Sequence, residues 1–211
     1  MKWVLIAVAV LAAVVLLVVI TGLALPRAHI AARSARLAAP PERVWAMVSE
    51  PARFPTWRSS VTAVDALPPA TDGRARWREI GGDGRITYEL VAASPPRAGP
   101  GRLVTRIADP SLPFGGEWEM SVAASDSGAA GAGGTVVTIT ERGEVRNPIF
   151  RFVSRFVMGH ASTIERYLRD LGRALGESVT PAPAPPASPE AAVSATSSTS
   201  TRSTRARTAR M

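Results

Sequence analysis

The sequence predicts an α+β domain in which a curved antiparallel sheet of about six to seven strands lies against one long C-terminal helix, preceded by one transmembrane helix. Three observations lead to this prediction. Residues 3–25 are an uncharged apolar run, the middle of the chain alternates apolar and polar residues in short segments, and residues 147–176 carry one apolar stripe at helical spacing. The expected boundaries are 1–27 for the anchor, 28–176 for the domain and 177–211 for a tail.

The composition of the 211-residue chain narrows the possible classes of function. The absence of cysteine excludes disulfides, cysteine nucleophiles and thiolate metal sites, and the presence of only two histidines argues against a zinc or iron site. The formal charge is +8, but residues 28–176 hold 19 Arg and 15 Asp plus Glu, and the basic residues are not clustered with aromatic ones. We therefore expect no metal, no cofactor and no nucleic-acid partner.

The apolar run is expected to be a retained membrane anchor. Trp3 to Leu25 are 23 uncharged residues, which at about 1.5 Å per residue can cross a hydrocarbon layer of roughly 30 Å. A cleaved signal peptide is the alternative, with residues 22–24 as a possible cleavage site, but its apolar core would normally have about 7 to 15 residues. Only Lys2 precedes the run and four arginines follow it between residues 27 and 43, so the positive-inside rule predicts a single-pass protein whose domain lies in the cytoplasm.

Residues 29–39 are interpreted as a first strand. Pro40 and Pro41 introduce a short helix that ends at the Glu50-Pro51 pair, and residues 52–57 form a second short turn or helix. Further strands are expected at residues 61–66, 74–80, 85–92, 102–108, 117–124 and 135–145.

Several of these strands alternate clearly between apolar and polar residues. This pattern is typical of an antiparallel sheet that is covered on one face only. Residues 81–84 are expected to form a hairpin turn, and residues 125–134 a loop between the last two strands.

Residues 147–176 are expected to form one continuous helix. Asn147 can cap it, Pro148 suits its first position, and Gly176 suits the left-handed residue that ends a helix. About 28 residues at about 1.5 Å each would make a helix roughly 42 Å long. Its apolar stripe consists of Ile149, Phe152, Val153, Phe156, Ile164, Leu168, Leu171 and Leu175.

The tail, residues 177–211, is dominated by Ser, Thr, Pro and Ala and ends in a basic stretch. Such a segment buries too little apolar surface to offset its ordering entropy, so we expect it to be disordered and dispensable for folding. Its basic end is interpreted as solubilising, with contact to anionic lipid head groups as the alternative.

The order of the predicted elements resembles that of the START-like, or SRPBCC, superfamily, whose helix-grip fold has this layout. The residues that carry the resemblance are 37–57, 135–148 and the helix to Gly176. The similarity spans roughly residues 29–176 and points to the polyketide cyclase/dehydrase and lipid-transport branch. It implies a cavity between the sheet and the helix, and it implies fold more directly than activity, because members bind ligands, cyclise polyketides or do neither.

Alternation predicts which side chains face this cavity. Aromatic and aliphatic walls with a few polar groups are typical of a small-molecule site. The expected ligand-binding residues are Trp77, Glu79, Tyr88, Leu90, Trp118, Met120, Ile139 and Glu141 from the strands, with Phe152, Phe156 and His160 from the helix.

Three of these residues are candidates for catalysis, namely Glu141, His160 and Tyr88. A carboxylate buried without a partner has a raised pKa and can act as an acid or base, but Glu141 can equally be paired with an arginine or reach water. His160 lies on the apolar stripe, where a core histidine is the alternative to a catalytic one. The tryptophans at 77 and 118 either stack on a ligand or belong to the core.

The leading hypothesis is a membrane-anchored domain that binds a hydrophobic or amphipathic small molecule, such as a lipid. The alternatives are a cyclase or dehydratase that uses acid/base residues in the cavity, and a ligand-free module that docks onto a membrane protein. A cavity of several hundred Å³ (order of magnitude) would favour ligand binding, whereas a filled core would favour docking. The sequence does not identify a protein partner.

Overall fold

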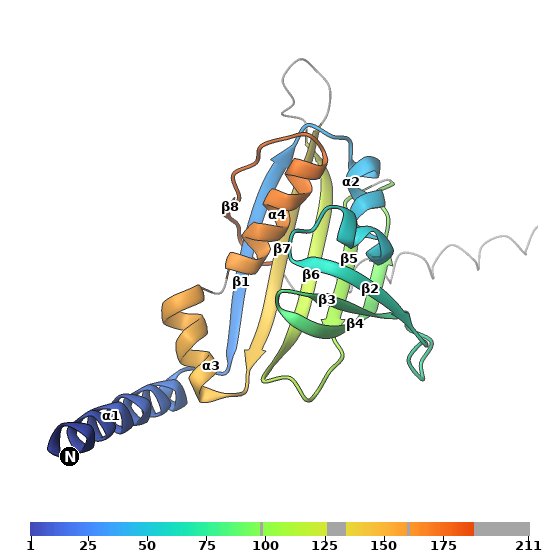
Figure 1. The fold of residues 1–211 in the computed structure, drawn as a ribbon. Helices are drawn as coiled ribbons and strands as arrows, with labels where there is room; N and C mark the ends of the chain where they lie inside the picture. Colours follow the sequence, from blue (N-terminus) through green and yellow to red (C-terminus); the bar gives the residue numbers. More distant parts are fainter. Residues whose placement is uncertain (98, 126–133, 160, 188–211) are drawn as a thin grey trace, which may run out of the picture.

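The computed structural model describes residues 1–97, 99–125, 134–159 and 161–187. Within these residues the strands form a single antiparallel sheet in the order β2-β3-β4-β5-β6-β7-β1-β8 (Figure 1). The strands are β1 (Ala28–Leu37), β2 (Val61–Leu67), β3 (Arg76–Gly81), β4 (Gly84–Ser94), β5 (Gly101–Ile107), β6 (Phe114–Ser125), β7 (Gly134–Val145) and the two-residue β8 (Ala182–Pro183). The predicted α+β helix-grip architecture is therefore confirmed.

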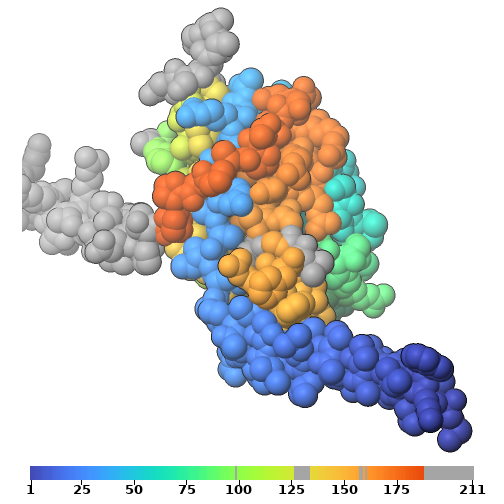
Figure 2. Space-filling view, turned by 90° about the vertical axis from the view of Figure 1, so that its left-hand side faces the viewer, coloured from blue at the N-terminus to red at the C-terminus, as the bar shows by residue number. Residues whose placement is uncertain are grey.

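The helices of the described chain are α1 (Lys2–Ala24), α2 (Pro41–Val48), the 3₁₀ helix η1 (Pro51–Thr56), α3 (Pro148–Val153), the π-helical turn η3 (Ser154–Met158) and α4 (Ser162–Ala174). Helices α2 and α4 lie on one face of the sheet, and α1 and α3 lie together beyond one end of it (Figure 1). Helix α4 lies across β1 and β7, and α2 with η1 covers the neighbouring part of the same face. Helix α1 protrudes from the body of the domain (Figure 2).

Helix α1 has a mean hydropathy of 3.3 and is long and apolar enough to cross a membrane. Most of its large side chains are exposed, so it is not the core helix of this domain. Its length and composition are compatible with a membrane anchor or with a signal sequence.

The strand register follows the predicted alternation. Trp77 on β3 lies opposite Tyr88 on β4, and Trp118 on β6 lies opposite Glu141 on β7. The turn predicted at residues 81–84 joins β3 to β4 as a hairpin. Because paired residues project to the same face, the four side chains all lie on the face that the helices cover.

The prediction of one continuous C-terminal helix is wrong. Asn147 caps α3 through hydrogen bonds from the amides of Ile149 (2.9 Å) and Phe150 (3.3 Å), as expected, but the helix widens into η3 and ends at Gly159. The Gly159 amide bonds to the Ser154 carbonyl five residues back, and its φ of 73° is accessible to glycine at little cost. Helix α4 then starts separately at Ser162.

The prediction that the tail begins at residue 177 is also wrong for its first part. Glu177 accepts hydrogen bonds from the amides of Ala38 (2.6 Å) and Ala39 (3.1 Å), and β8 pairs with the edge of β1. The Ala187 amide donates to the Thr140 hydroxyl at 3.0 Å. Residues 177–187 thus run over β1 as an ordered strap (Figure 2), and the rest of the predicted tail, 188–211, lies outside the described residues.

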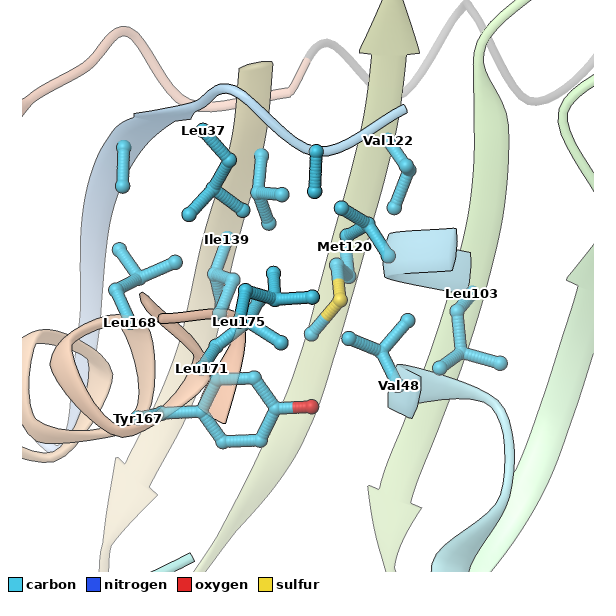
Figure 3. Close-up of a cluster of buried hydrophobic side chains, with 14 of the residues drawn as sticks. Leu37, Val48, Leu103, Met120, Val122, Ile139, Tyr167, Leu168, Leu171 and Leu175 are labelled. Carbon is cyan, nitrogen blue, oxygen red and sulfur yellow. The ribbon is translucent and has the colours of Figure 1, made fainter. Parts of the chain in front are cut away.

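The core lies between α4, α2 and the sheet (Figure 3). From α4, Ile164, Leu168 and Leu171 are at most 1% exposed, and they pack on fully buried residues of β7 such as Val137 and Ile139. The apolar stripe of α4 therefore packs on the alternate apolar residues of the strands, as expected, and this packing fixes α4 on the sheet.

Candidate functional site

A cavity of about 500 Å³ opens beside this core, between the sheet and the covering helices. Its size falls in the range of small-molecule sites. The strands contribute most of its wall, η1 and α4 contribute Phe54 and Tyr167, and the segment after β7 contributes Phe150, Ser154 and Gly159.

Seven of the residues predicted for the site line this cavity. They are Trp77, Glu79, Tyr88, Leu90, Trp118, Met120 and Glu141. Ile139 lies in the core beneath α4 and is fully buried. Whether the seven bind a ligand stays a prediction.

The helix residues predicted for the site are placed differently. Phe156 is 60% exposed, and its ring lies 5.0 Å from that of Phe152, so the two aromatics contact each other and not the cavity. The cause is the break at Gly159, which separates this turn from the α4 register that faces the sheet. His160 lies outside the described residues.

One polar group on the cavity wall is centred on Glu79, which is 8% exposed. Arg58 donates to its Oε2 at 2.8 Å, and Trp77 Nε1 donates to its Oε1 at 3.1 Å. The Arg58 guanidinium also lies 4.9 Å from the Phe54 ring centroid and 5.0 Å from that of Tyr167. These contacts neutralise the buried carboxylate and hold Arg58 between two aromatic rings.

A second polar group is centred on Glu141. Its Oε1 lies 3.1 Å from His29 Nε2, and its Oε2 accepts a hydrogen bond from Trp118 Nε1 at 2.9 Å. An arginine was one expected partner of Glu141; in the structure its partners are a histidine and a tryptophan. The Trp118 ring in turn packs edge-on against Tyr167, with centroids 5.7 Å apart.

Two tyrosines complete the polar lining. Tyr88 stacks on Trp77 with an interplanar angle of 20°, and Tyr167 projects from α4 over the sheet (Figure 3). Burial raises the pKa of both phenols, so each remains a neutral donor and acceptor at ordinary pH. Among the described residues neither hydroxyl has a hydrogen-bond partner. Both are therefore available to a bound molecule or to water.

The charges around the cavity are unequal. Besides the two tyrosines, the ionisable side chains in its lining are Arg58, Glu79, Asp83, Glu141, Glu144 and His29. The single arginine among the described lining residues is already paired with a carboxylate. A ligand with a negative charge would therefore meet more acidic than basic groups. The described residues contain no group of three or more His, Asp or Glu side chains that could hold a metal ion.

Sequence reasoning missed Arg58, His29 and Tyr167. Tyr167 follows Ile164 by three residues and precedes Leu171 by four, so its place on the apolar face of α4 was readable from helical spacing. Arg58 and His29 had no local signal, because their partners lie 21 and 112 residues away in the chain.

The comparisons with known proteins agree on the fold. The profile of the family described as polyketide cyclase / dehydrase and lipid transport matches residues 28–176. No match was found among curated proteins.

Three similar solved structures come from different organisms. A hypothetical protein from Helicobacter pylori has a TM-score of 0.53 at 8% identity, with 68% of this chain and 85% of that chain covered. A truncated norcoclaurine synthase from Thalictrum flavum has a TM-score of 0.50 at 8% identity, with 70% and 93% covered. A START superfamily protein from Mycobacterium smegmatis has a TM-score of 0.47 at 16% identity, with 70% and 97% covered.

At such identities the first two structures support a shared fold and nothing about activity. The family match is more direct, since it covers well over half of the chain, including every strand from β1 to β7 and helix α4. The chain therefore belongs to the family described as polyketide cyclase / dehydrase and lipid transport.

Proposed function

We propose that the domain binds a neutral, amphipathic small molecule in the cavity between the sheet and α4, and that α1 holds it at a membrane. The observation that carries this proposal is the cavity itself, about 500 Å³ with walls of aromatic and aliphatic side chains and two phenol hydroxyls that have no hydrogen-bond partner among the described residues. Apolar walls provide affinity, and a few unpaired polar groups orient the ligand. Such a volume supports ligand binding over the alternative of a ligand-free docking module.

The charge of the lining supports a neutral ligand over an anionic one. Arg58 is held by Glu79, so a ligand carboxylate or phosphate would have to displace an ion pair that is about nine-tenths buried. Separating such a pair leaves an uncompensated buried charge, which is strongly unfavourable. A hydroxyl, carbonyl or amide on the ligand can instead bond to Tyr88 or Tyr167 without breaking any contact.

The membrane part of the proposal rests on α1. A hydrophobic ligand is more concentrated in a bilayer than in water, so an anchored domain would meet it there. The arginines that follow α1 favour a cytoplasmic domain, which predicts that protease added to sealed, right-side-out cells leaves the domain intact. Digestion from outside would reject this orientation.

Binding can be measured with the full-length protein in detergent, using a fluorescent long-chain alcohol and the fatty acid of the same chain and fluorophore. We expect the alcohol to bind more tightly. Tyr88→Phe and Tyr167→Phe keep the rings and remove the hydroxyls; a lost hydrogen bond of about 1 kcal/mol corresponds to roughly fivefold weaker binding of the alcohol.

Leu90→Trp should abolish binding of the alcohol by filling the cavity. Its control is Ile30→Trp, which makes a similar change at a side chain that is 62% exposed and outside the cavity lining. Native mass spectrometry of protein purified from its own membranes would then identify the natural ligand. Unchanged binding in Leu90→Trp, or tighter binding of the fatty acid, would contradict the proposal.

Catalysis is a second candidate, favoured by the contact between Glu141 and His29 on the cavity wall. A carboxylate beside an imidazole is an arrangement that can move a proton to or from a bound substrate. In this case Glu141→Gln should abolish turnover of the ligand identified above while its binding is retained. Identical ligand in the wild type and the variant after long incubation would leave binding as the function.

A further inference from the structure

The end of α1 is packed tightly against the start of α3. Gly22 is buried, and a Cβ atom at this position would lie only 1.9 Å from the Pro148 carbonyl oxygen. Val18 and Val19 are half-buried, whereas nearly all earlier residues of α1 are exposed. Glycine therefore permits a close approach of two helices that no other residue would allow here.

A buried arginine joins the same two helices. Arg151 on α3 is 5% exposed, and its Nη1 donates to the carbonyls of Leu25 (3.0 Å) and Leu23 (3.5 Å) at the end of α1. Its Nη2 donates to the Arg146 carbonyl at 3.3 Å. The last carbonyls of a helix have no intrahelical donors and attract positive charge. Arg151 thus caps α1 from the folded domain, so α1 is fixed to the domain and is not a flexible tether.

The segment held in this way, residues 148–158 (α3 and η3), has an exposed apolar surface. Ile149 is 44% exposed, Phe150 is 49% exposed and Phe156 is 60% exposed. Large exposed side chains grouped on one short segment indicate a surface that contacts another apolar phase. The nearby exposed arginines at positions 27 and 155 give the same region a basic border.

The position of this segment along α1 identifies that phase. The 23 residues of α1 span about 35 Å at 1.5 Å per residue, slightly more than a hydrocarbon layer of about 30 Å. The contacts with α3 fall on residues 18–25, within about 10 Å of the end of α1. Amphipathic helices at membrane surfaces lie at this level, with their apolar face about 5–10 Å into the boundary between head groups and acyl chains.

We propose that the 148–158 segment lies in the membrane interface beside α1, with Ile149, Phe150 and Phe156 inserted among the lipids. The partner is the bilayer that α1 crosses, and anionic head groups fit the basic border. Phe150 and Ser154 also line the cavity, so this placement brings that part of the cavity wall to the membrane. The proposal rests on the proposed anchoring by α1, and a ligand would then enter the cavity from the lipid phase.

The absence of cysteine from the chain allows a direct test. Full-length protein is reconstituted into vesicles of phosphatidylcholine and phosphatidylglycerol, with an environment-sensitive fluorophore on one introduced cysteine. Phe156→Cys reports on the segment, Leu11→Cys on the middle of α1, and Thr71→Cys on an exposed loop of the domain. Brominated lipids then quench the fluorophores that are inserted into the membrane.

We expect blue-shifted emission and strong quenching at positions 156 and 11, and neither at position 71. Quenching at position 11 without quenching at position 156 would overturn the proposal, and absence of quenching at position 11 would remove its premise. In Arg151→Gln, quenching at position 156 should be reduced while quenching at position 11 remains. Gly22→Val is a second variant for the same contact, and circular dichroism checks the fold of both.

Binding of the alcohol probe in detergent is measured on the same labelled proteins. Loss of quenching at position 156 with normal binding would reject the interface and leave the proposed function intact. Normal quenching without any binding would reject the cavity ligand and leave the interface. The two proposals can therefore fail separately.

Discussion

Replacing Asp170 tests most directly how α4 is held against the loop that forms part of the cavity wall. The Asp170 side chain is 2% exposed and accepts hydrogen bonds from the amide and the hydroxyl of Ser59, both at 2.7 Å, and from Arg173 at 2.9 Å. It therefore ties α4 to the loop that carries Arg58 and Ser60, two residues of the cavity wall.

Asp170→Ala should lower the free energy of unfolding by about 2–3 kcal/mol, because it removes the charged acceptor of these hydrogen bonds, while its partners Ser59 and Arg173 are exposed and leave no buried charge unpaired. The estimate agrees with about 1.5–3 kcal/mol for each hydrogen bond to a charged group, since such bonds are not additive. For a domain of this size each kcal/mol lowers the thermal midpoint by about 2–4 °C. Ser59→Ala keeps the amide bond and should cost only about 1–2 kcal/mol.

Urea unfolding of the two single variants and the double variant gives the coupling between the side chains. We expect a coupling energy of about 1–3 kcal/mol between positions 170 and 59, because they are in direct contact. The alcohol probe should also bind more weakly to Asp170→Ala, since the loop that positions Arg58 is released. A loss below about 1 kcal/mol, or strictly additive effects, would refute this account of the loop.

Two further predictions concern the helix break at Gly159 and the strap of residues 177–187, where the structure differs from the sequence-based prediction. Ile164→Ala should cost about 2–5 kcal/mol, whereas Phe156→Ala should cost less than about 1 kcal/mol in detergent, because only the first side chain is buried; equal losses in urea unfolding would contradict the helix break. Truncation after Ala187 keeps every described contact of the strap and should leave the thermal midpoint unchanged. Truncation after Glu177 should lower it by a few degrees, for a loss of about 1–2 kcal/mol, and an unchanged midpoint would show that the strap contributes nothing.

The sequence was most informative where structure depends on neighbouring residues. Alternation placed Trp77 and Trp118 on the face that lines the cavity. The capping role of Asn147 is confirmed by the two hydrogen bonds that its side chain accepts, and that of Gly176 by its φ of 83°. These features follow from backbone geometry within a few residues. They therefore need no knowledge of the rest of the fold.

Features that depend on distant partners were not predictable in this way. Asp170 and Ser59 are 111 residues apart, and Arg151 reaches the end of α1 over 126 residues. A polar residue on a helix has the same local pattern whether or not a distant loop supplies its donors. The strap was missed for a related reason, because its Pro- and Ala-rich composition is typical of a disordered tail and it is ordered by a strand edge and a few hydrogen bonds.

The helix break was readable, and its consequences connect the fold to the proposed function. Glycine at position 159 lies in the gap of the apolar stripe between Phe156 and Ile164, where a helix-ending residue costs no core contact. In one continuous helix both apolar halves would face the sheet; with the break, only the half on α4 does. The other half is left on the outside, where its exposure to water is unfavourable at about 25 cal/mol per Å² of apolar surface.

That cost is removed if the same surface lies in a membrane. The contact of Gly22 with Pro148 places this surface at the end of α1, the one helix in the described part of the chain that is long and apolar enough to span a bilayer. The break thus divides one stripe into two surfaces with different apolar partners. On α4 the partner is the sheet, which makes the fixed wall of the cavity. On the 148–158 segment, in the arrangement that we propose, the partner is lipid, and the cavity-lining residues Phe150 and Ser154 are held where a membrane-soluble ligand would be.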